Sequence, residues 1–338
     1  MGVTDTIHSG PGRLAGRLTR RTALAALAGA MGAPGIVRAQ AFPSKGVRIL
    51  VAFPPGGAAD LVARLVADRL AQTWGQAVVV ENRPGAGGNV AGAEVARSDP
   101  DAHTLLITSQ SVSVAKLLYA RMAYDPATDL APVSMAIRVP NVMVVPVASP
   151  DRTVQDFLDR ARANPGKLNF GSAGVGTSIH MAGELFKHLA KVEMTHVPYR
   201  GAGPAMNDLI SGRLDVMFDT VTVSTPQLRA GTIRALGITS ATRHATLPDV
   251  PPIADTVPGY EVNSWFAFFT AARSPADAIA RIARDMATAL KDPAITERLA
   301  SLGATAVGST PEELGAAMRA EQALWEPVIR TAGIRIDG

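Results

Sequence analysis

The sequence contains no cysteine among its 338 residues. This absence excludes disulfide bonds, thiolate catalysis and cysteine-ligated zinc. Aromatic residues make up only 5% and charged residues 18%, against 47% hydrophobic residues, and this composition fits neither a disordered chain nor a coiled coil. No uncharged apolar run reaches the roughly 20 residues that a membrane-spanning helix needs. The sequence therefore predicts a globular protein, and its length suggests about two domains.

A surplus of positive charge is also missing from most of the chain. There are 33 lysines and arginines against 29 aspartates and glutamates. Residues 1–41 hold five of the basic residues but only Asp5 of the acidic ones, which leaves 28 of each in residues 42–338. Because phosphate binding requires surplus positive charge, this balance argues against a nucleic-acid-binding surface.

Residues 1–41 have the pattern of an export signal. Arg20 and Arg21 precede an Ala/Leu-rich run at 22–33, and Ala39-Gln40-Ala41 supplies a cleavage site of the small-x-small type. The apolar run is too short for a membrane anchor, and the adjacent arginines are typical of twin-arginine export. We expect cleavage after Ala41, with cleavage after Ala39 as the alternative, and a mature protein in the periplasm.

The rest of the chain alternates short apolar runs with helical patterns. Residues 47–53 form an apolar run, and residues 60–74 follow with the i, i+3, i+4 spacing of a helix. The same alternation recurs along the chain, and a second series begins near residue 142. Such alternation predicts α/β architecture with mainly parallel sheets flanked by helices. We expect one lobe from residues 42–139 plus 260–338, a second from 140–259, and a cleft between them.

Four glycine-rich turns each join a predicted strand to a predicted helix. They lie at residues 53–57, 82–89, 171–178 and 199–204, two in each expected lobe. The first N–H groups of a helix have no partner within it, and the helix dipole is positive at that end. In open α/β sheets these turns lie where ligands bind. The turns therefore predict a site for a carboxylate, although each could also be a tight turn without a ligand.

Motifs for nucleotide binding and catalysis are incomplete. The turn at 171–178 has no lysine for a phosphate loop, and Val90 stands where the third glycine of a dinucleotide fingerprint belongs. His180 and Glu184 have helical i, i+4 spacing but no third ligand, so we expect neither a metal nor another cofactor. Asp60 fits the start of a helix, and Asp219 could orient a ligand amine or a neighbouring backbone group. An acid/base pair of Asp60 and Asp219 remains the catalytic alternative.

The order of these segments resembles the periplasmic substrate-binding proteins of tripartite tricarboxylate transporters, also called Bug proteins. The resemblance covers nearly all of residues 42–338 and is carried by FPSKGVRILVAFPPGGAAD, WGQAVVVENRPGAGGNVAGAEVA, LNFGSAGVGTSIHMAGELFK and THVPYRGAGPAMNDLISGRLDVMFD. It implies a two-lobed clamshell of the Venus-flytrap type (type II-like), monomeric and without enzymatic activity. Such a protein captures a small organic acid and delivers it to membrane permease subunits. A sensor that uses the same clamshell and a secreted α/β enzyme are the alternatives.

The resemblance also implies a set of ligand-binding residues. In the first lobe these are Pro54, Pro55, Gly56, Gly57 and Asp60, with Ser109 and its neighbours Gln110 and Ser111 tuning selectivity. In the second lobe Ser172, Ala173, Gly176, Thr177 and His180 would meet the carboxylate, with Tyr199, Gly203 and Asp219 nearby. The sequence departs from the family pattern at Ala59, at His103 and at residues 271–275, which we expect to lie outside the two main ligand loops.

Overall fold

The computed structural model describes residues 1–2 and 42–335. The described residues 42–335 form one compact unit. The predicted export signal lies outside the described residues. Within them, no helix combines the length and the apolar character that crossing a bilayer requires.

The first lobe is built on a sheet with the strand order β2-β1-β3-β9-β4, and β10 pairs with the far side of β4. Its strands are β1 (Val47–Val51), β2 (Val78–Asn82), β3 (Thr104–Ser109), β9 (Asn263–Ala271), β10 (Thr305–Ala306) and the first part of β4 (Leu130–Pro146). Strands β1, β2, β3 and β4 run in one direction, whereas β9 and β10 run against them. The pairs β1–β2 and β1–β3 are parallel, whereas β3–β9, β4–β9 and β4–β10 are antiparallel, so the α/β architecture is confirmed with a mixed sheet in place of a mainly parallel one.

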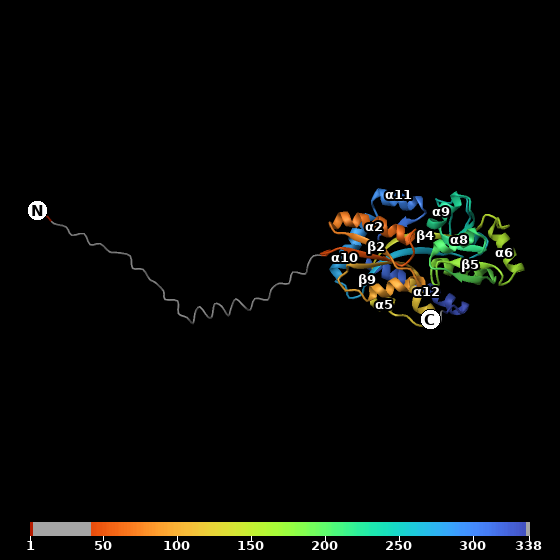
Figure 1. Ribbon diagram of the computed structural model, residues 1–338, viewed down its shortest axis with the longest axis horizontal. Helices are drawn as coiled ribbons and strands as arrows, with labels where there is room; N and C mark the ends of the chain where they lie inside the picture. Colours follow the sequence, from red (N-terminus) through yellow and green to blue (C-terminus); the bar gives the residue numbers. More distant parts are fainter. Residues whose placement is uncertain (3–41, 336–338) are drawn as a thin grey trace. The chain divides into compact units, whose positions relative to one another are not determined.

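The second lobe has the strand order β8-β4-β7-β5-β6. Its strands are β5 (Asn169–Ser172), β6 (Thr195–Pro198), β7 (Val216–Thr220), β8 (Ile233–Ile238) and the end of β4. Strand β4 runs against the other four, which share one direction. Residues 130–140 of β4 pair with β9, and residues 141–146 pair with β7 and β8. A single strand therefore belongs to both lobes (Figure 1).

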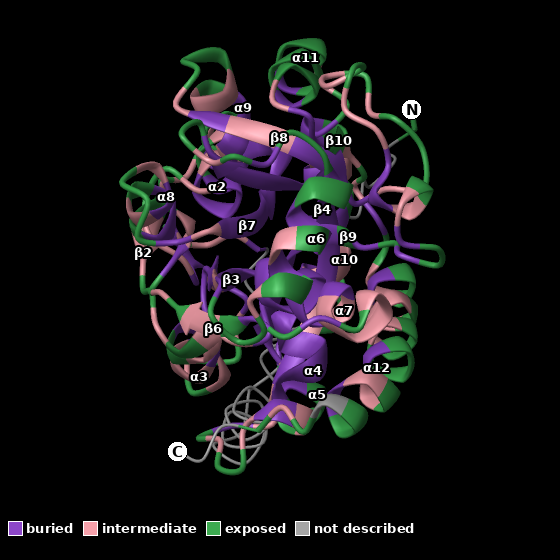
Figure 2. Cartoon of the chain, turned by 90° about the vertical axis from the view of Figure 1, so that its right-hand side faces the viewer, coloured by how far each residue is buried: buried purple, intermediate pink, exposed green. Residues whose placement is uncertain are grey.

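Helices cover both faces of each sheet, which explains why the inner strands are apolar throughout. The helices are α2 (Ala58–Trp74), α3 (Asn89–Ala96), α4 (Ser111–Leu118), α5 (Pro126–Asp129), α6 (Val154–Ala163), α7 (Ser178–Ala190), α8 (Ala202–Ile210), α9 (Val221–Arg229), α10 (Ala276–Ala289), α11 (Pro293–Ser301) and α12 (Pro311–Ala332), with short 3-10 turns at Ala86–Gly88 and Ile253–Asp255. In β1, Ile49 packs in the cluster that holds α2 and α10, while Leu50 packs in the cluster that holds α3. Figure 2 shows the buried strands enclosed by helices whose outer surfaces are exposed.

The predicted alternation of strands and helices is confirmed, but β4 begins at Leu130 instead of near residue 142. The sequence pattern did not predict the first part of this strand because it contains Pro132 and Pro140. Proline cannot donate a hydrogen bond to a neighbouring strand, so its presence argues against a strand. In the structure the register of β4 against β9 shifts between Pro132 and Ser134, so Pro132 lies at an irregularity of the pairing.

The C-terminal helix contacts both lobes. The first turns of α12 place Leu314 in the core of the first lobe. Near its other end, Trp325 and Ile329 pack in the cluster that contains Phe157 and Phe186 of the second lobe. Helix α12 therefore packs against both lobes.

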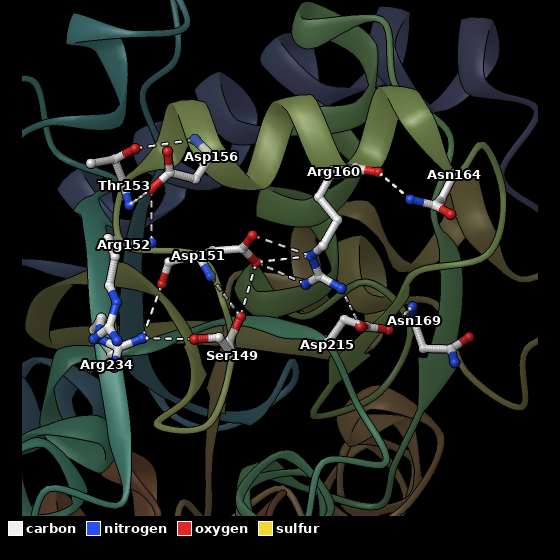
Figure 3. Close-up of polar contacts among 10 residues, drawn as sticks. All are labelled: Ser149, Asp151, Arg152, Thr153, Asp156, Arg160, Asn164, Asn169, Asp215 and Arg234. Carbon is white, nitrogen blue, oxygen red and sulfur yellow. Dashed lines mark hydrogen bonds and ion pairs between the residues drawn. The ribbon is translucent and has the colours of Figure 1, made fainter.

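A polar network fixes the end of the second lobe at which β5 and β7 begin (Figure 3). Arg160 of α6 forms ion pairs with Asp151 and Asp215, each at 2.8 Å. Asp215 in turn accepts a hydrogen bond from the Asn169 N–H at the start of β5. Arg234 donates to the carbonyl groups of the turn after β4. The opposite, carboxyl ends of β5 and β7 are left free to form the site described next.

Candidate binding site between the two lobes

The carboxyl ends of strands from both lobes surround a cavity of about 230 Å³. The first lobe contributes the turn after β1, the end of β3 and part of β9, and the second lobe contributes the turns and helix starts after β5, β6 and β7. The lining residues are Phe53, Pro54, Pro55, Gly56, Gly57, Ala58, Ala59, Ser109, Ala173, Thr177, Ser178, Ile179, Ala202, Gly203, Thr220, Val223 and Phe266. We call this space the inner chamber.

The lining of the inner chamber includes no lysine, arginine, histidine, aspartate or glutamate. Hydroxyl groups come from Ser109, Thr177, Ser178 and Thr220, and most of the remaining wall is apolar. The Phe53 and Phe266 rings meet edge to face, with their centroids 6.2 Å apart. The chamber therefore offers neutral hydrogen-bonding groups beside an apolar surface.

Three helices begin at the inner chamber without a side-chain cap. The residues before their first turns are Gly57 for α2, Gly201 for α8 and Thr220 for α9, and none caps its helix with a side chain. Away from the chamber, α5, α6, α11 and α12 are capped by their own aspartate or threonine side chains, whereas α3, α4 and α10 also lack a side-chain cap. The uncapped first turns leave N–H groups and the positive ends of helix dipoles beside the chamber, an arrangement that suits an anion.

Thr177 both caps helix α7 and lines the inner chamber. Its hydroxyl caps α7 by accepting a hydrogen bond from the His180 N–H, and it donates a 2.7 Å hydrogen bond to the Gly174 carbonyl. The same side chain lines the inner chamber. It therefore fixes the 172–177 loop while presenting its surface to a ligand.

Asp60 does not line the inner chamber. Its carboxylate accepts hydrogen bonds from the Gly56 N–H at 3.0 Å, from Asn82 at 3.0 Å and from Arg64 at 2.9 Å. Burial opposes ionisation, but these hydrogen bonds hold the pKa of Asp60 below its ordinary value. Asp60 thus shapes the turn that carries Gly56 and Gly57.

Ser172 and His180 also lie behind the wall. The His180 ring is buried and stacks on the ring of His196, with centroids 4.0 Å apart, and its Nδ1 accepts a hydrogen bond from the Gly176 N–H. Burial lowers the pKa of His180 well below its ordinary value, so the ring is neutral and offers no positive charge to a carboxylate. The Ser172 hydroxyl lies 2.6 Å from His196 Nε2.

Asp219 and Gly176 also lie outside the wall of the inner chamber. The Asp219 side chain is fully buried, with a 3.0 Å hydrogen bond from Ser224 to Oδ2 and no partner for Oδ1 among the described residues. Burial raises the pKa of Asp219 to about 7. Gly176 faces the first lobe, because a Cβ there would lie 2.8 Å from Leu118 Cδ1.

The structure thus brings only part of the predicted set to the inner chamber. The predicted residues in its wall are Pro54, Pro55, Gly56, Gly57, Ser109, Ala173, Thr177 and Gly203. Of the neighbours of Ser109, Gln110 is fully buried and accepts from the Trp265 N–H, and the Ser111 hydroxyl donates to the Gly87 carbonyl. Contrary to expectation, the family departure Ala59 does lie in the wall.

Several residues of the inner-chamber wall were not in the predicted set of ligand-binding residues. Ser178 and Ala202 lie within the predicted glycine-rich turns, and Ala58 and Thr220 stand at helix starts, where the same rule could have found them. Phe53 lies in the predicted turn at 53–57, whereas Ile179, Val223 and Phe266 gave no such signal, because an apolar residue that faces a cavity has the same sequence pattern as a core residue.

A second cavity of about 310 Å³, which we call the outer chamber, shares Phe53, Pro54 and Ala173 with the inner chamber. Its other walls are Ala52, Pro84, Gly85, Ala86, Gly87, Gly88, Tyr119, Gly174, Val175, Pro198, Tyr199 and Arg200. The predicted residue Tyr199 therefore lines this chamber instead of the inner one.

The two lobes touch beside these chambers. A Cβ on Gly87 would collide with the Val175 carbonyl oxygen, and a Cβ on Gly201 would lie 2.5 Å from Pro54 Cδ. Glycine at these positions therefore allows close approach of the two lobes.

Residues 62–334 match the family described as the tripartite tricarboxylate transporter family receptor. The chain belongs to this family. It is 42% identical over 315 residues to a UPF0065 protein of the tcbD–tcbE intergenic region in a Pseudomonas species, across 92% of this chain and 94% of that one.

Solved structures show the same fold in other receptors of this kind. Rpa4515 of R. palustris with adipate is 38% identical with a TM-score of 0.84, across 87% of this chain and 100% of that one. The periplasmic binding protein BugD is 31% identical with a TM-score of 0.83, again across 87% and 100%. MatC of Rhodopseudomonas palustris with bound malate is 32% identical with a TM-score of 0.81, across 85% and 100%. The family comprises periplasmic solute receptors, and the chain has their two-lobed fold.

Proposed function

We propose that this protein is an exported solute-binding protein that captures a small organic carboxylate between its lobes and delivers it to the membrane subunits of a tripartite tricarboxylate-type transporter. The observation that carries the proposal is the convergence of uncapped helix starts from both lobes on one uncharged chamber. The lobes of this proposal are residues 42–139 plus 260–338 and residues 140–259. Adipate in Rpa4515 and malate in MatC support a carboxylate ligand.

Neutral groups can supply the affinity that such a receptor needs. A hydrogen bond to a charged group contributes about 1.5–3 kcal/mol, and micromolar binding requires about 8 kcal/mol. Several N–H and hydroxyl contacts around one carboxylate reach that value, even after the cost of ordering the ligand and lobes. The apolar wall adds burial of the rest of the ligand.

Binding would be coupled to closure of the lobes. A ligand in the inner chamber touches elements of both lobes, and it therefore favours the closed arrangement over the open one. Closure would bend the segments that cross between the lobes, where the Thr239 hydroxyl bonds both Asn141 and Val262.

Gly57→Asp tests the proposed anion site. Gly57 has φ −80°, and a Cβ there meets only the Pro54 carbonyl, at 3.8 Å, so the substitution fits. The new carboxylate would cap α2 and should raise the stability of the ligand-free protein by about 0.5 kcal/mol. By occupying the anion site it should weaken carboxylate binding at least about 100-fold.

The measurements are calorimetric titration with adipate and malate and thermal melting of the ligand-free protein. Gly315→Asp is the matched control, because Gly315 lies on α12 with room for a Cβ and lines neither chamber. Unchanged affinity of Gly57→Asp for a carboxylate that the parent binds would refute the site. Conversion of the carboxylate during incubation would refute the receptor function.

A further inference from the structure

The loop at residues 172–177 takes part in both the ligand chamber and the contact between the lobes. Ala173 and Thr177 line the inner chamber. The Val175 carbonyl oxygen lies so close to Gly87 of the first lobe that a Cβ on Gly87 would collide with it. A change in the shape of this loop would therefore alter the chamber wall and the approach of the two lobes together.

A histidine behind the loop holds its backbone. The Nδ1 atom of His180 accepts a 3.2 Å hydrogen bond from the Gly176 N–H. Gly176 is buried, and among the described residues the ring nitrogen is the only acceptor for this N–H. In the next residue, the Thr177 side chain accepts a hydrogen bond from the His180 N–H. Because a buried N–H without a partner costs free energy, the His180 ring stabilises this shape of the loop.

The ring can accept this hydrogen bond only while it is neutral. A neutral imidazole has one nitrogen that accepts and one that donates, whereas an imidazolium ion donates from both. In the neutral ring Nδ1 accepts from Gly176, so Nε2 carries the hydrogen, at 3.8 Å from Glu184 Oε1. Protonation of His180 would place a second N–H against the Gly176 N–H and break the bond that holds the loop.

The surroundings of His180 favour the neutral ring. Phe170 of β5 and His196 of β6 stack on it, with ring centroids 6.3 Å and 4.0 Å away. The titratable groups that act on the ring, within the described part of the chain, are His196, Lys187 and Glu184, and the last two form an ion pair at 2.9 Å. Strands β4 and β7 and helix α12, which also pack against α7, contribute apolar and aromatic side chains to the same cluster. Burial, followed by the effects of His196 and Lys187, lowers the pKa of His180 well below 6.5.

We propose that His180 is a positioning residue for ligand binding: its neutral ring holds residues 173–177 in the shape that lines the inner chamber, and protonation of the ring releases them. The ring does not line the chamber, so it acts on the ligand through the loop. This inference rests on the proposed function and goes beyond it by making carboxylate capture depend on the protonation of one buried side chain. Acid should therefore weaken binding through His180.

Two substitutions of His180 separate the hydrogen bond from the titration. His180→Asn places an amide oxygen near the position of Nδ1 and does not titrate, whereas His180→Leu removes the acceptor. Calorimetric titration at pH 7.5 with adipate and malate should show about tenfold weaker binding by His180→Leu, the loss expected for one buried hydrogen bond. His180→Asn should recover most of that loss.

The pH profile distinguishes positioning by a neutral ring from a purely structural role. Between pH 7.5 and pH 5.5, the affinity of the parent should fall about three- to tenfold relative to that of His180→Asn. The reason is that a released imidazole, with an ordinary pKa of 6.5, gains a proton over this range, whereas asparagine does not. Protonation of the ligand and of other groups affects both proteins, so the ratio of the two affinities is the readout.

His188→Asn is the matched control, since it makes the same substitution on the same helix at a position that lines neither chamber. Its affinity should follow that of the parent at every pH. A parent-to-Asn ratio that stays constant with pH, or a His180→Asn variant that binds as weakly as His180→Leu, would overturn the role of His180. The pH comparison stands even where His180→Leu does not fold. A parent that binds no carboxylate at any pH would overturn the proposed function instead.

Discussion

Burial changes the pKa of individual residues near the inner chamber. The Asp219 carboxyl group lies one residue before the chamber wall begins at Thr220, yet it is fully buried and its Oδ1 has no partner among the described residues. The neutral acid is favoured in such surroundings, which is why burial raises the pKa of Asp219 to about 7 from an ordinary value of 3.8.

This shift predicts a pH-dependent stability that Asp219→Asn should remove. The Asp219 carboxylate binds a proton more tightly in the folded state than in the unfolded state. The stabilisation of the fold by this proton is therefore complete below about pH 4 and is lost as the pH rises to about 7. Between pH 4 and pH 8 the parent should therefore lose roughly 2–4 kcal/mol of unfolding free energy relative to Asp219→Asn. Urea denaturation at both pH values measures the difference. The exposed Asp249→Asn should show no comparable effect, and parallel pH profiles for parent and Asp219→Asn would contradict this account.

Elements determine which residues meet the ligand. Strand ends and helix starts can be predicted from sequence, because apolar runs, glycine turns and helical spacing have different periodicities. That reasoning located Gly57, Thr177 and Gly203. The same reasoning could not predict what the His180 side chain contacts. Helical spacing shows which face of its own helix a residue occupies, but it does not show which strand or ring packs against that face. The stacking on His196 depends on β6, whose position comes from the tertiary fold.

Two threonines that cap helices allow effects on stability and on binding to be measured separately. Thr177 caps α7 at the inner chamber, whereas Thr153 caps α6 away from both chambers. Thr177→Ala and Thr153→Ala should each lower the unfolding free energy by about 1 kcal/mol. Only Thr177→Ala should also weaken carboxylate binding, by about tenfold, and Thr177→Ser should largely restore it. Calorimetric titration and urea denaturation of the three variants provide the readouts; equal affinities in the two alanine variants would remove Thr177 from the site.

The whole molecule depends on contacts between lobes that were invisible in the sequence. Glycine turns were predicted as ligand loops, but the structure uses Gly87 and Gly201 also to let the two lobes approach each other. Nothing in the local pattern distinguishes a glycine that admits a ligand from one that admits another backbone, because both need the same missing side chain. Their partners, Val175 and Pro54, lie far from them along the chain.

Gly87→Ala should therefore hinder closure. Gly75→Ala is a matched control, since both glycines have φ 64° but a Cβ on Gly75 meets nothing within 4 Å. Both variants should lose about 1 kcal/mol of stability from the left-handed backbone. Only Gly87→Ala should weaken ligand binding, mainly through faster dissociation, and keep a larger radius of gyration when saturated with ligand. Small-angle scattering and stopped-flow displacement measure these effects, and identical behaviour of the two variants would exclude the contact with Val175 as part of closure.

The continuity of strand β4 limits how this protein can be divided into fragments. Its first eleven residues complete one sheet and its last six complete the other, so a fragment containing either half alone would expose an unsatisfied edge of backbone amides and carbonyls. Neither half is an interchangeable module. Recombination with a relative should respect this strand, with both crossover points placed so that β4 and its partners are inherited together.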